Sequence, residues 1–144
     1  MIRNEISSGI LVYRVKNGLR EYLFLRRKEG FLDLTKGHIE EGESDLMAAK
    51  METLEESGLD VEPIKGFREE MHYSYSGRGC EINKTVIMFL GKSGENAEPR
   101  ISHEHVGFVW LNYEDALNKV TFRNQKDLIM HAETFIEKNN QLQA

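Results

Sequence analysis

One acidic segment constrains the possible folds of this chain more than any other feature. Residues 37–60 hold eight carboxylates and one lysine, a net charge of −7, whereas the rest of the chain holds 18 basic and 16 acidic residues. Residues 43–57 of this segment have the spacing of a helix. Ser44 is a candidate N-cap, Asp45 suits the positive end of the helix, and Gly58 is a candidate stop. The sequence therefore predicts a helix with a very acidic surface.

The predicted helix has two distinct faces. Its apolar positions form a stripe that we expect to pack into the core, because methionines at helical spacing commonly fill gaps: Met47, Met51 and Leu54. Three glutamates share a separate face: Glu52, Glu55 and Glu56. Like charges at these spacings repel by about 0.2–0.5 kcal/mol per pair. Two interpretations stay open, a solvated acidic face and a divalent-metal site formed by converging oxygens.

The segment before the helix favours phosphate chemistry. Residues 35–42 hold two glycines among polar residues and are predicted to form a loop, whose backbone could approach phosphates. Glu43 follows this loop directly. Mg²⁺ usually binds one or two carboxylates together with substrate phosphate oxygens. The pattern thus indicates metal-assisted attack of water on phosphorus.

The remaining pattern predicts an α/β protein with a mixed sheet between helices. The predicted strands are Ser7–Val15, Glu21–Arg26, Phe67–Tyr75, Glu81–Gly91 and Val106–Leu111. Asn17-Gly18 is a typical hairpin turn between the first two strands. A short helix capped by Asn112 and a last helix over Asn124–Asn139 complete the pattern. No repeat or linker divides the chain, so we expect one domain over residues 1–144.

Composition excludes several classes of protein. The longest apolar run is five residues, against about 20 for a membrane helix. Cys80 is the single cysteine, so no intramolecular disulfide can form, and this suits a reducing compartment. The sequence has no basic stripe, so it does not indicate an extended surface for binding nucleic acid. We expect a cytoplasmic protein that acts on a small molecule.

The spacing within residues 37–59 resembles the Nudix box, the loop–helix–loop signature of the Nudix hydrolases. The residues that carry the resemblance are Gly37, Glu43, Glu52, Glu55, Glu56, Ser57, Gly58 and Leu59. It implies the Nudix α/β/α sandwich. One position departs, because Met51 stands where the family usually has an arginine that pairs with the early glutamate, here Glu43. The neighbouring Lys50 is a candidate to replace that pairing.

Segments outside the box resemble the asymmetrical diadenosine tetraphosphate hydrolases of animal and archaeal type. These segments are Lys36–Glu40, Gly66–Tyr73, Lys84–Ile87 and Ser102–His105, with Trp110-Leu111 after them. The resemblance implies cleavage of diadenosine tetraphosphate to ATP and AMP by water attack, with Mg²⁺ or Mn²⁺. Residues Phe31–Thr35 depart from the family, which tends to have aromatic and proline residues there.

The resemblance also implies roles for individual residues. The expected metal ligands are Glu52, Glu55, Glu56 and Glu104. The catalytic candidates are Glu55, Glu56 and Glu104, and which of them is the general base stays open. Lys36, His38 and Lys84 are expected to hold the polyphosphate, and Tyr73 and Phe122 to stack on a nucleobase. For Phe122, packing in the core is an equal alternative. His103 and His105 could either support the metal ligands from behind or be exposed loop residues, and we favour exposed loop residues.

Other functions also fit the sequence. The same reaction could act on a nucleoside triphosphate, a nucleotide sugar or capped RNA. Loss of the box arginine at Met51 would also suit a catalytically silent Nudix nucleotide-binding module. Against the silent module stand the retained glutamates, which repel one another without a cation. For the assembly we expect a monomer or a weak dimer.

Overall fold

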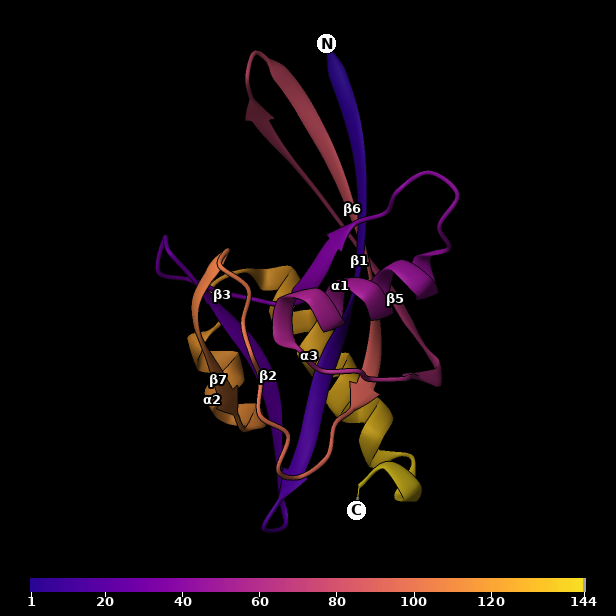
Figure 1. Ribbon diagram of the computed structural model, residues 1–144, viewed down its shortest axis with the longest axis vertical. Helices are drawn as coiled ribbons and strands as arrows, with labels where there is room; N and C mark the ends of the chain where they lie inside the picture. Colours follow the sequence, from indigo (N-terminus) through magenta and orange to yellow (C-terminus); the bar gives the residue numbers. More distant parts are fainter. Residues whose placement is uncertain (144) are drawn as a thin grey trace.

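A mixed seven-stranded sheet forms the centre of the computed structural model, which describes residues 1–143 (Figure 1). Its strands are β1 (Ile2–Lys16), β2 (Leu19–Arg27), β3 (Leu32–Asp33), β4 (Thr35–His38), β5 (Pro63–Gly77), β6 (Cys80–Lys92) and β7 (His105–Leu111). The helices are α1 (Asp45–Ser57), α2 (Tyr113–Lys119) and α3 (Arg123–Glu137), followed by a 3-10 turn at Asn140–Leu142. The expectation of one domain over 1–144 stays a prediction, and Ala144 lies outside the described residues.

Strand β1 is the centre of the sheet. It pairs in parallel with β6 and antiparallel with β2, and the order along the sheet is β3-β2-β1-β6-β5. The middle of β1 pairs with β4, from Ser7 opposite His38 to Ile10 opposite Thr35. The predicted mixed sheet is therefore present. The expected loop over residues 35–42 is partly wrong, because β4 takes up its first four residues by pairing with β1.

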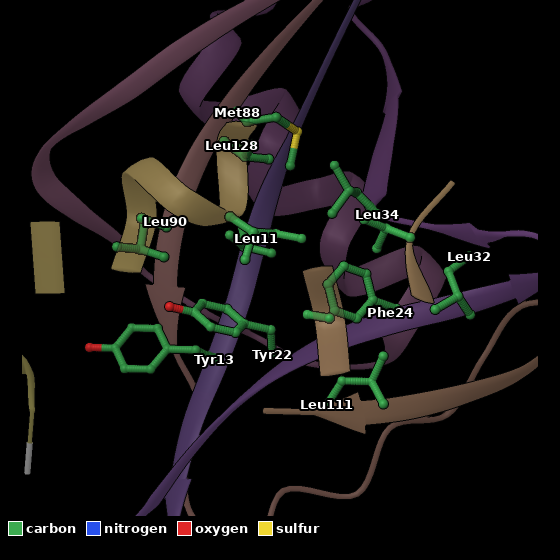
Figure 2. Packing of buried hydrophobic residues seen from close by; sticks show 14 of the residues in the cluster. Leu11, Tyr13, Tyr22, Phe24, Leu32, Leu34, Met88, Leu90, Leu111 and Leu128 are labelled. Carbon is green, nitrogen blue, oxygen red and sulfur yellow. The ribbon is translucent and has the colours of Figure 1, made fainter. Parts of the chain in front are cut away.

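The two faces of β1 bury two separate cores. Leu11 and Tyr13 point into a core with Phe24 and with Leu128 of α3, which Figure 2 shows from close by. The alternate residues of β1 pack on the opposite face with Ala49 of α1. Successive side chains of a strand point to opposite faces, so one strand serves both cores. Helix α1 thus covers one face and α3 the other, which confirms the predicted sandwich.

The face by which α1 packs differs from the prediction. Its buried residues are Ala48, Ala49, Thr53, Glu56 and Ser57. The expectation that the stripe at Met47, Met51 and Leu54 enters the core is wrong, since these side chains are 62%, 49% and 42% exposed. Small residues let the helix lie close to the sheet, where Thr53 Oγ1 is 3.1 Å from Thr35 Oγ1. The large apolar side chains are left on the outer face.

Local signals set the ends of α1 as predicted. The side chain of Ser44 accepts a hydrogen bond from Met47 N at 3.1 Å. Gly58 has φ +74° and donates its N–H to Leu54 O at 2.8 Å. Because Ser44 is the cap, the helix begins at Asp45, two residues later than expected. Asn17 and Gly18 both have positive φ, as the predicted hairpin turn requires.

The predicted strands are present but longer than expected. The hairpin of β5 and β6 runs beside the start of β1 as an arm beyond the sandwich (Figure 1). The side chains of β5 in this hairpin are mostly exposed, so the hydrophobic pattern that marks a strand is weak there. Among residues 1–143 no helix is both long and apolar enough to span a bilayer.

Candidate active site

A cavity of about 950 Å³ lies between the β5–β6 arm and the start of α3. All five residues predicted to bind substrate line it: Lys36, His38, Tyr73, Lys84 and Phe122. They come from β4, β5, β6 and the residue that precedes α3. The fold thus brings to one cavity residues that are up to 86 positions apart in the sequence, between Lys36 and Phe122. Their individual roles stay predictions.

Both lysines of the cavity have a carboxylate partner. Lys36 Nζ lies 3.4 Å from Asp33 Oδ1, and Lys84 Nζ lies 3.6 Å from Glu5 Oε1. Burial lowers the pKa of Lys84, an effect that Glu5 opposes. An ammonium group has three donors, so each lysine keeps donors for a further anion. The arrangement fits binding of an anionic ligand.

Aromatic side chains reach the cavity from three separate parts of the chain. Tyr73 and Tyr75 stack on β5, with ring centroids 6.3 Å apart. Phe122 is 45% exposed and meets Phe31 edge-on at 5.3 Å. The alternative prediction that Phe122 packs in the core is therefore wrong. Exposed ring faces of this kind can stack on nucleobases.

The acidic residues of α1 form a cluster. Within residues 1–143, no basic side chain forms an ion pair with Glu52, a member of this cluster. Burial raises the pKa of Glu52, and the negative charges of Glu55, Glu43 and Glu104 raise it further. Glu104 is exposed and directly precedes β7. The segment that carries it lies against α1, since Ser102 N donates to Glu56 O at 3.2 Å. Several carboxylates without a counter-charge are a donor set that suits a hard divalent cation.

Glu56 connects the acidic cluster to the cavity. Its side chain is buried, and burial raises its pKa to about 8. Glu56 Oε1 accepts a hydrogen bond from Lys36 N at 2.9 Å. Lys36 therefore contacts Glu56 through its backbone and lines the cavity.

Gly37 allows the helix side chains to approach β4 closely. A Cβ atom at this position would lie 2.1 Å from Glu52 Oε2 and 2.2 Å from its Cδ. An added Cβ would therefore displace the Glu52 carboxylate from this position. The first glycine of the box thus has a steric reason in this structure.

The loop before α1 is held without the box arginine. Glu43 Oε1 accepts a hydrogen bond from Glu40 N at 2.8 Å, and Glu43 N donates to Glu40 O at 3.0 Å. Lys50 forms an ion pair with Glu62 instead. The expectation that Lys50 could replace the pairing with Glu43 is therefore wrong. The reason is the orientation of Lys50, which points from α1 toward the chain that follows the helix.

Within residues 1–143, no three His, Cys, Asp or Glu side chains are arranged so that together they could hold a metal ion. The carboxylates near α1 still suit a divalent metal ion, because Mg²⁺ binds one or two protein carboxylates and completes its coordination with water and phosphate oxygens. For Glu52, burial and the neighbouring carboxylates all raise the pKa, whereas for Glu56 the backbone N–H and the positive charge of Lys36 oppose the rise in pKa that burial causes.

His105 lies in a different environment from the one predicted. It is the first residue of β7 and is 5% exposed, and neither ring nitrogen has a hydrogen-bond partner among the described residues. The expectation that His105 is an exposed loop residue is wrong, because it is the first residue of β7 and its side chain is buried. Burial lowers the pKa of His105. His103, in contrast, is exposed as expected.

Sequence reasoning missed five charged residues of the cavity: Glu5, Arg27, Asp33, Arg123 and Asp127. Arg27 ends β2 and Asp33 ends β3, a two-residue strand that was not predicted. The departure from the family over Phe31–Thr35 was the one signal that pointed to Asp33. Glu5 and Arg27 had no signal, since charged strand residues are most often solvated.

Comparison with known proteins agrees with this geometry. The NUDIX domain model matches residues 4–132. The chain belongs to the NUDIX family. The assignment drawn from the spacing of residues 37–59 is confirmed, and so is the α/β fold.

This NUDIX chain is similar to several proteins of named activity. It is 36% identical over 132 residues to the asymmetrical bis(5′-nucleosyl)-tetraphosphatase of Sus scrofa, covering 88% of this chain and 87% of the relative. The structure of a Caenorhabditis elegans Ap4A hydrolase binary complex has a TM-score of 0.85 and 25% identity, and covers 93% of this chain and 98% of the other. The Escherichia coli dihydroneopterin triphosphate pyrophosphohydrolase shares the fold, with a TM-score of 0.72 and 20% identity over 90% of this chain and 96% of the other.

Proposed function

We propose that this NUDIX chain hydrolyses diadenosine tetraphosphate (Ap4A) asymmetrically to ATP and AMP. The observation that carries the proposal is the junction at Lys36, whose side chain lines the cavity and whose backbone N–H donates to Glu56. A ligand in the cavity is thereby adjacent to the acidic cluster. The names of the relatives from Sus scrofa and Caenorhabditis elegans support the choice of substrate.

The cavity residues would bind the substrate by charge and by stacking. Lys36 and Lys84 supply ammonium donors to the phosphates, and His38 supplies a further donor. Tyr73 and Phe122 offer exposed ring faces for a nucleobase, a contact that contributes about 1–3 kcal/mol in single-strand binding. A volume of about 950 Å³ suits a ligand with more than one nucleoside.

The carboxylates would hold Mg²⁺ or Mn²⁺, with Glu52, Glu55, Glu56 and Glu104 as the proposed ligands. A divalent cation supplies neutralising charge for the phosphates and makes the phosphorus more electrophilic. The chain's own part is to position these oxygens, and Gly37 does so by leaving room for Glu52. A carboxylate of the cluster takes the proton of the attacking water.

Three catalytic candidates, Glu55, Glu56 and Glu104, could accept that proton. Substitution of each by glutamine separates them. The general base is the residue whose loss removes the acidic limb of the rate profile while Mn²⁺ binding is retained. A metal ligand instead loses Mn²⁺ affinity together with activity. If all three variants keep the full rate, the proposed cluster is not the catalytic group.

Hydrolysis of Ap4A in ¹⁸O-labelled water, with products assigned by mass, tests the proposal. We expect label in AMP alone, because water attacks the phosphorus next to one adenosine. Label in ATP would place the attack on the other side of the cleaved bridge and would overturn this mechanism. A rate panel with a nucleoside triphosphate, a nucleotide sugar and capped RNA measures substrate preference.

A catalytically silent module is the alternative from a different class. It predicts nucleotide binding with no turnover in Mg²⁺ or Mn²⁺. The mutually repelling glutamates argue against it, since a module without a cation gains nothing from them. Loss of metal-dependent turnover in Glu56→Gln, with nucleotide binding retained, supports the enzyme.

We further propose a cytoplasmic location and a monomer or weak dimer that acts on a small nucleotide. The single cysteine supports a reducing compartment. Sedimentation velocity over a range of protein concentrations measures the assembly. A stable higher oligomer would contradict the proposed assembly, and fractionation of cells tests the location.

A further inference from the structure

Asp33 is a buried carboxylate of the cavity that the proposed function does not use. It is the last residue of β3, is 5% exposed, and lines the cavity beside Lys36. A buried charge is costly unless it is paired and hydrogen-bonded. A carboxylate would also repel a polyphosphate, so Asp33 is a poor direct ligand for one. Its position requires another explanation.

The two oxygens of Asp33 contact two different cations. Oδ2 lies 3.3 Å from Arg27 Nη1, and Oδ1 lies 3.4 Å from Lys36 Nζ. Oδ1 also accepts a hydrogen bond from Leu34 N at 2.8 Å, which fixes the orientation of the carboxylate. Both cation contacts are longer than the usual range for a charge-assisted hydrogen bond. Because a guanidinium has five N–H donors and an ammonium three, Arg27 and Lys36 keep donors for a second anion, and this holds although Arg27 also pairs with Glu29 at 3.5 Å.

On one side, these contacts lead to the aromatic wall of the cavity. The guanidinium carbon of Arg27 lies 5.7 Å from the ring centroid of Phe31. Phe31 in turn meets Phe122 edge-on. The position of Arg27 is thus linked to the side chains proposed to stack on a nucleobase.

On the other side, the contacts lead to the acidic cluster. Lys36 reaches Asp33 with its ammonium group and Glu56 with its backbone N–H at 2.9 Å. Asp33 thus lies at the junction of the aromatic wall, the polyphosphate lysine and the helix that carries the glutamates. No other carboxylate among the described residues pairs with both Arg27 and Lys36.

We propose that Asp33 is a positioning residue that holds Arg27 and Lys36 as a pair of cationic anchors for the polyphosphate. Arg27 joins the binding residues through this role. The inference rests on the proposed function for its substrate class, a nucleoside polyphosphate. Asp33 acts through the two cations and does not touch the phosphates.

Equilibrium binding of β,γ-methylene-ATP in EDTA, measured by titration calorimetry, tests the inference without turnover. Asp33→Asn keeps the acceptor for Leu34 N and removes the charge. We expect its dissociation constant to rise about tenfold, since Arg27 and Lys36 lose the negative charge that orients them. Asp33→Glu keeps the charge and is expected to recover most of the affinity. Asp33→Ser, with the same expected loss as Asp33→Asn, serves if the asparagine variant does not fold.

Glu21→Gln is the matched control. Glu21 of β2 also forms an ion pair, with Arg14 of β1 at 2.9 Å, but Glu21 does not line the cavity. We expect binding within twofold of the wild type. A loss as large as that of Asp33→Asn would mean that removal of any β2 ion pair weakens the fold, and would overturn the specific role of Asp33.

A double-mutant cycle with Lys36→Met shows whether Asp33 acts through Lys36. In the Lys36→Met background, Asp33→Asn should weaken binding much less than in the wild type, because one of its two partners is gone. Independent, multiplying losses overturn the proposal, and so does wild-type affinity in Asp33→Asn. If the wild type does not bind β,γ-methylene-ATP, the inference fails. If it binds but does not cleave Ap4A, only the proposed function fails.

Discussion

The stability of the metal-free protein should depend on the ionisation of Glu56. Burial raises the pKa of this carboxyl from 4.5 to about 8. The folded state therefore binds the proton more tightly than the unfolded chain does. The resulting stabilisation is fully present below pH 4.5 and is lost as pH rises through 8. Because one pKa unit corresponds to about 1.4 kcal/mol, full ionisation costs on the order of 5 kcal/mol.

Glu56→Gln removes this dependence, because an amide is neutral at every pH and can still accept from Lys36 N. Urea unfolding in EDTA at about pH 5 and about pH 8.5 measures the free energy of unfolding for both proteins. We expect the stability of the variant relative to the wild type to grow by on the order of 4 kcal/mol between these pH values. Comparison at each pH cancels the contributions of other titrating groups.

Glu55→Gln is the control, since it changes an exposed carboxylate of the same helix and should keep the wild-type pH dependence. Saturating Mn²⁺ at the higher pH should restabilise the wild type more than Glu56→Gln, by mass action on an ionised ligand. Parallel pH profiles of wild type and Glu56→Gln would refute the reasoning. They would mean that Glu56 ionises in the folded protein as it does in the unfolded chain.

Two further predictions follow from α1 and β4. Met51→Lys should change the free energy of urea unfolding by less than about 0.5 kcal/mol, because the side chain is on the exposed face. A loss of several kcal/mol would show that Met51 packs in the core. Gly37→Ala should keep its circular dichroism spectrum but lower kcat on Ap4A, because the added Cβ would lie 2.1 Å from Glu52 Oε2 and displace that carboxylate. An unchanged kcat would show that the position of Glu52 does not matter.

Signals that act through the nearby backbone could be predicted from the sequence. Ser44 caps α1 and Gly58 ends it, because each needs only the first or last turn of the helix for its hydrogen bond. Asn17-Gly18 forms a turn because both residues tolerate positive φ. The spacing of the glutamates along one helix also identified the family, since that pattern is contained within 23 residues.

The packing face of α1 could not be predicted in this way. The stripe that contains Met51 and the stripe that contains Ala49 both have helical spacing, and hydrophobicity alone favours the methionines. The close approach of α1 to β4 decides between them, because Thr53 contacts Thr35 and leaves room only for small side chains. That approach depends on the pairing of β4 with β1, which is a property of the whole sheet.

The same distinction between sequence and tertiary structure holds for the chemistry of the site. The sequence by itself determined which residues carry the charge, because the identities of Glu52, Glu56 and Lys36 need no partner to be recognised. Only the tertiary structure brought Glu104 near α1 and gave Asp33 two cationic partners. Such contacts join separate strands and loops, and their distances follow from sheet register and burial, which no local pattern specifies.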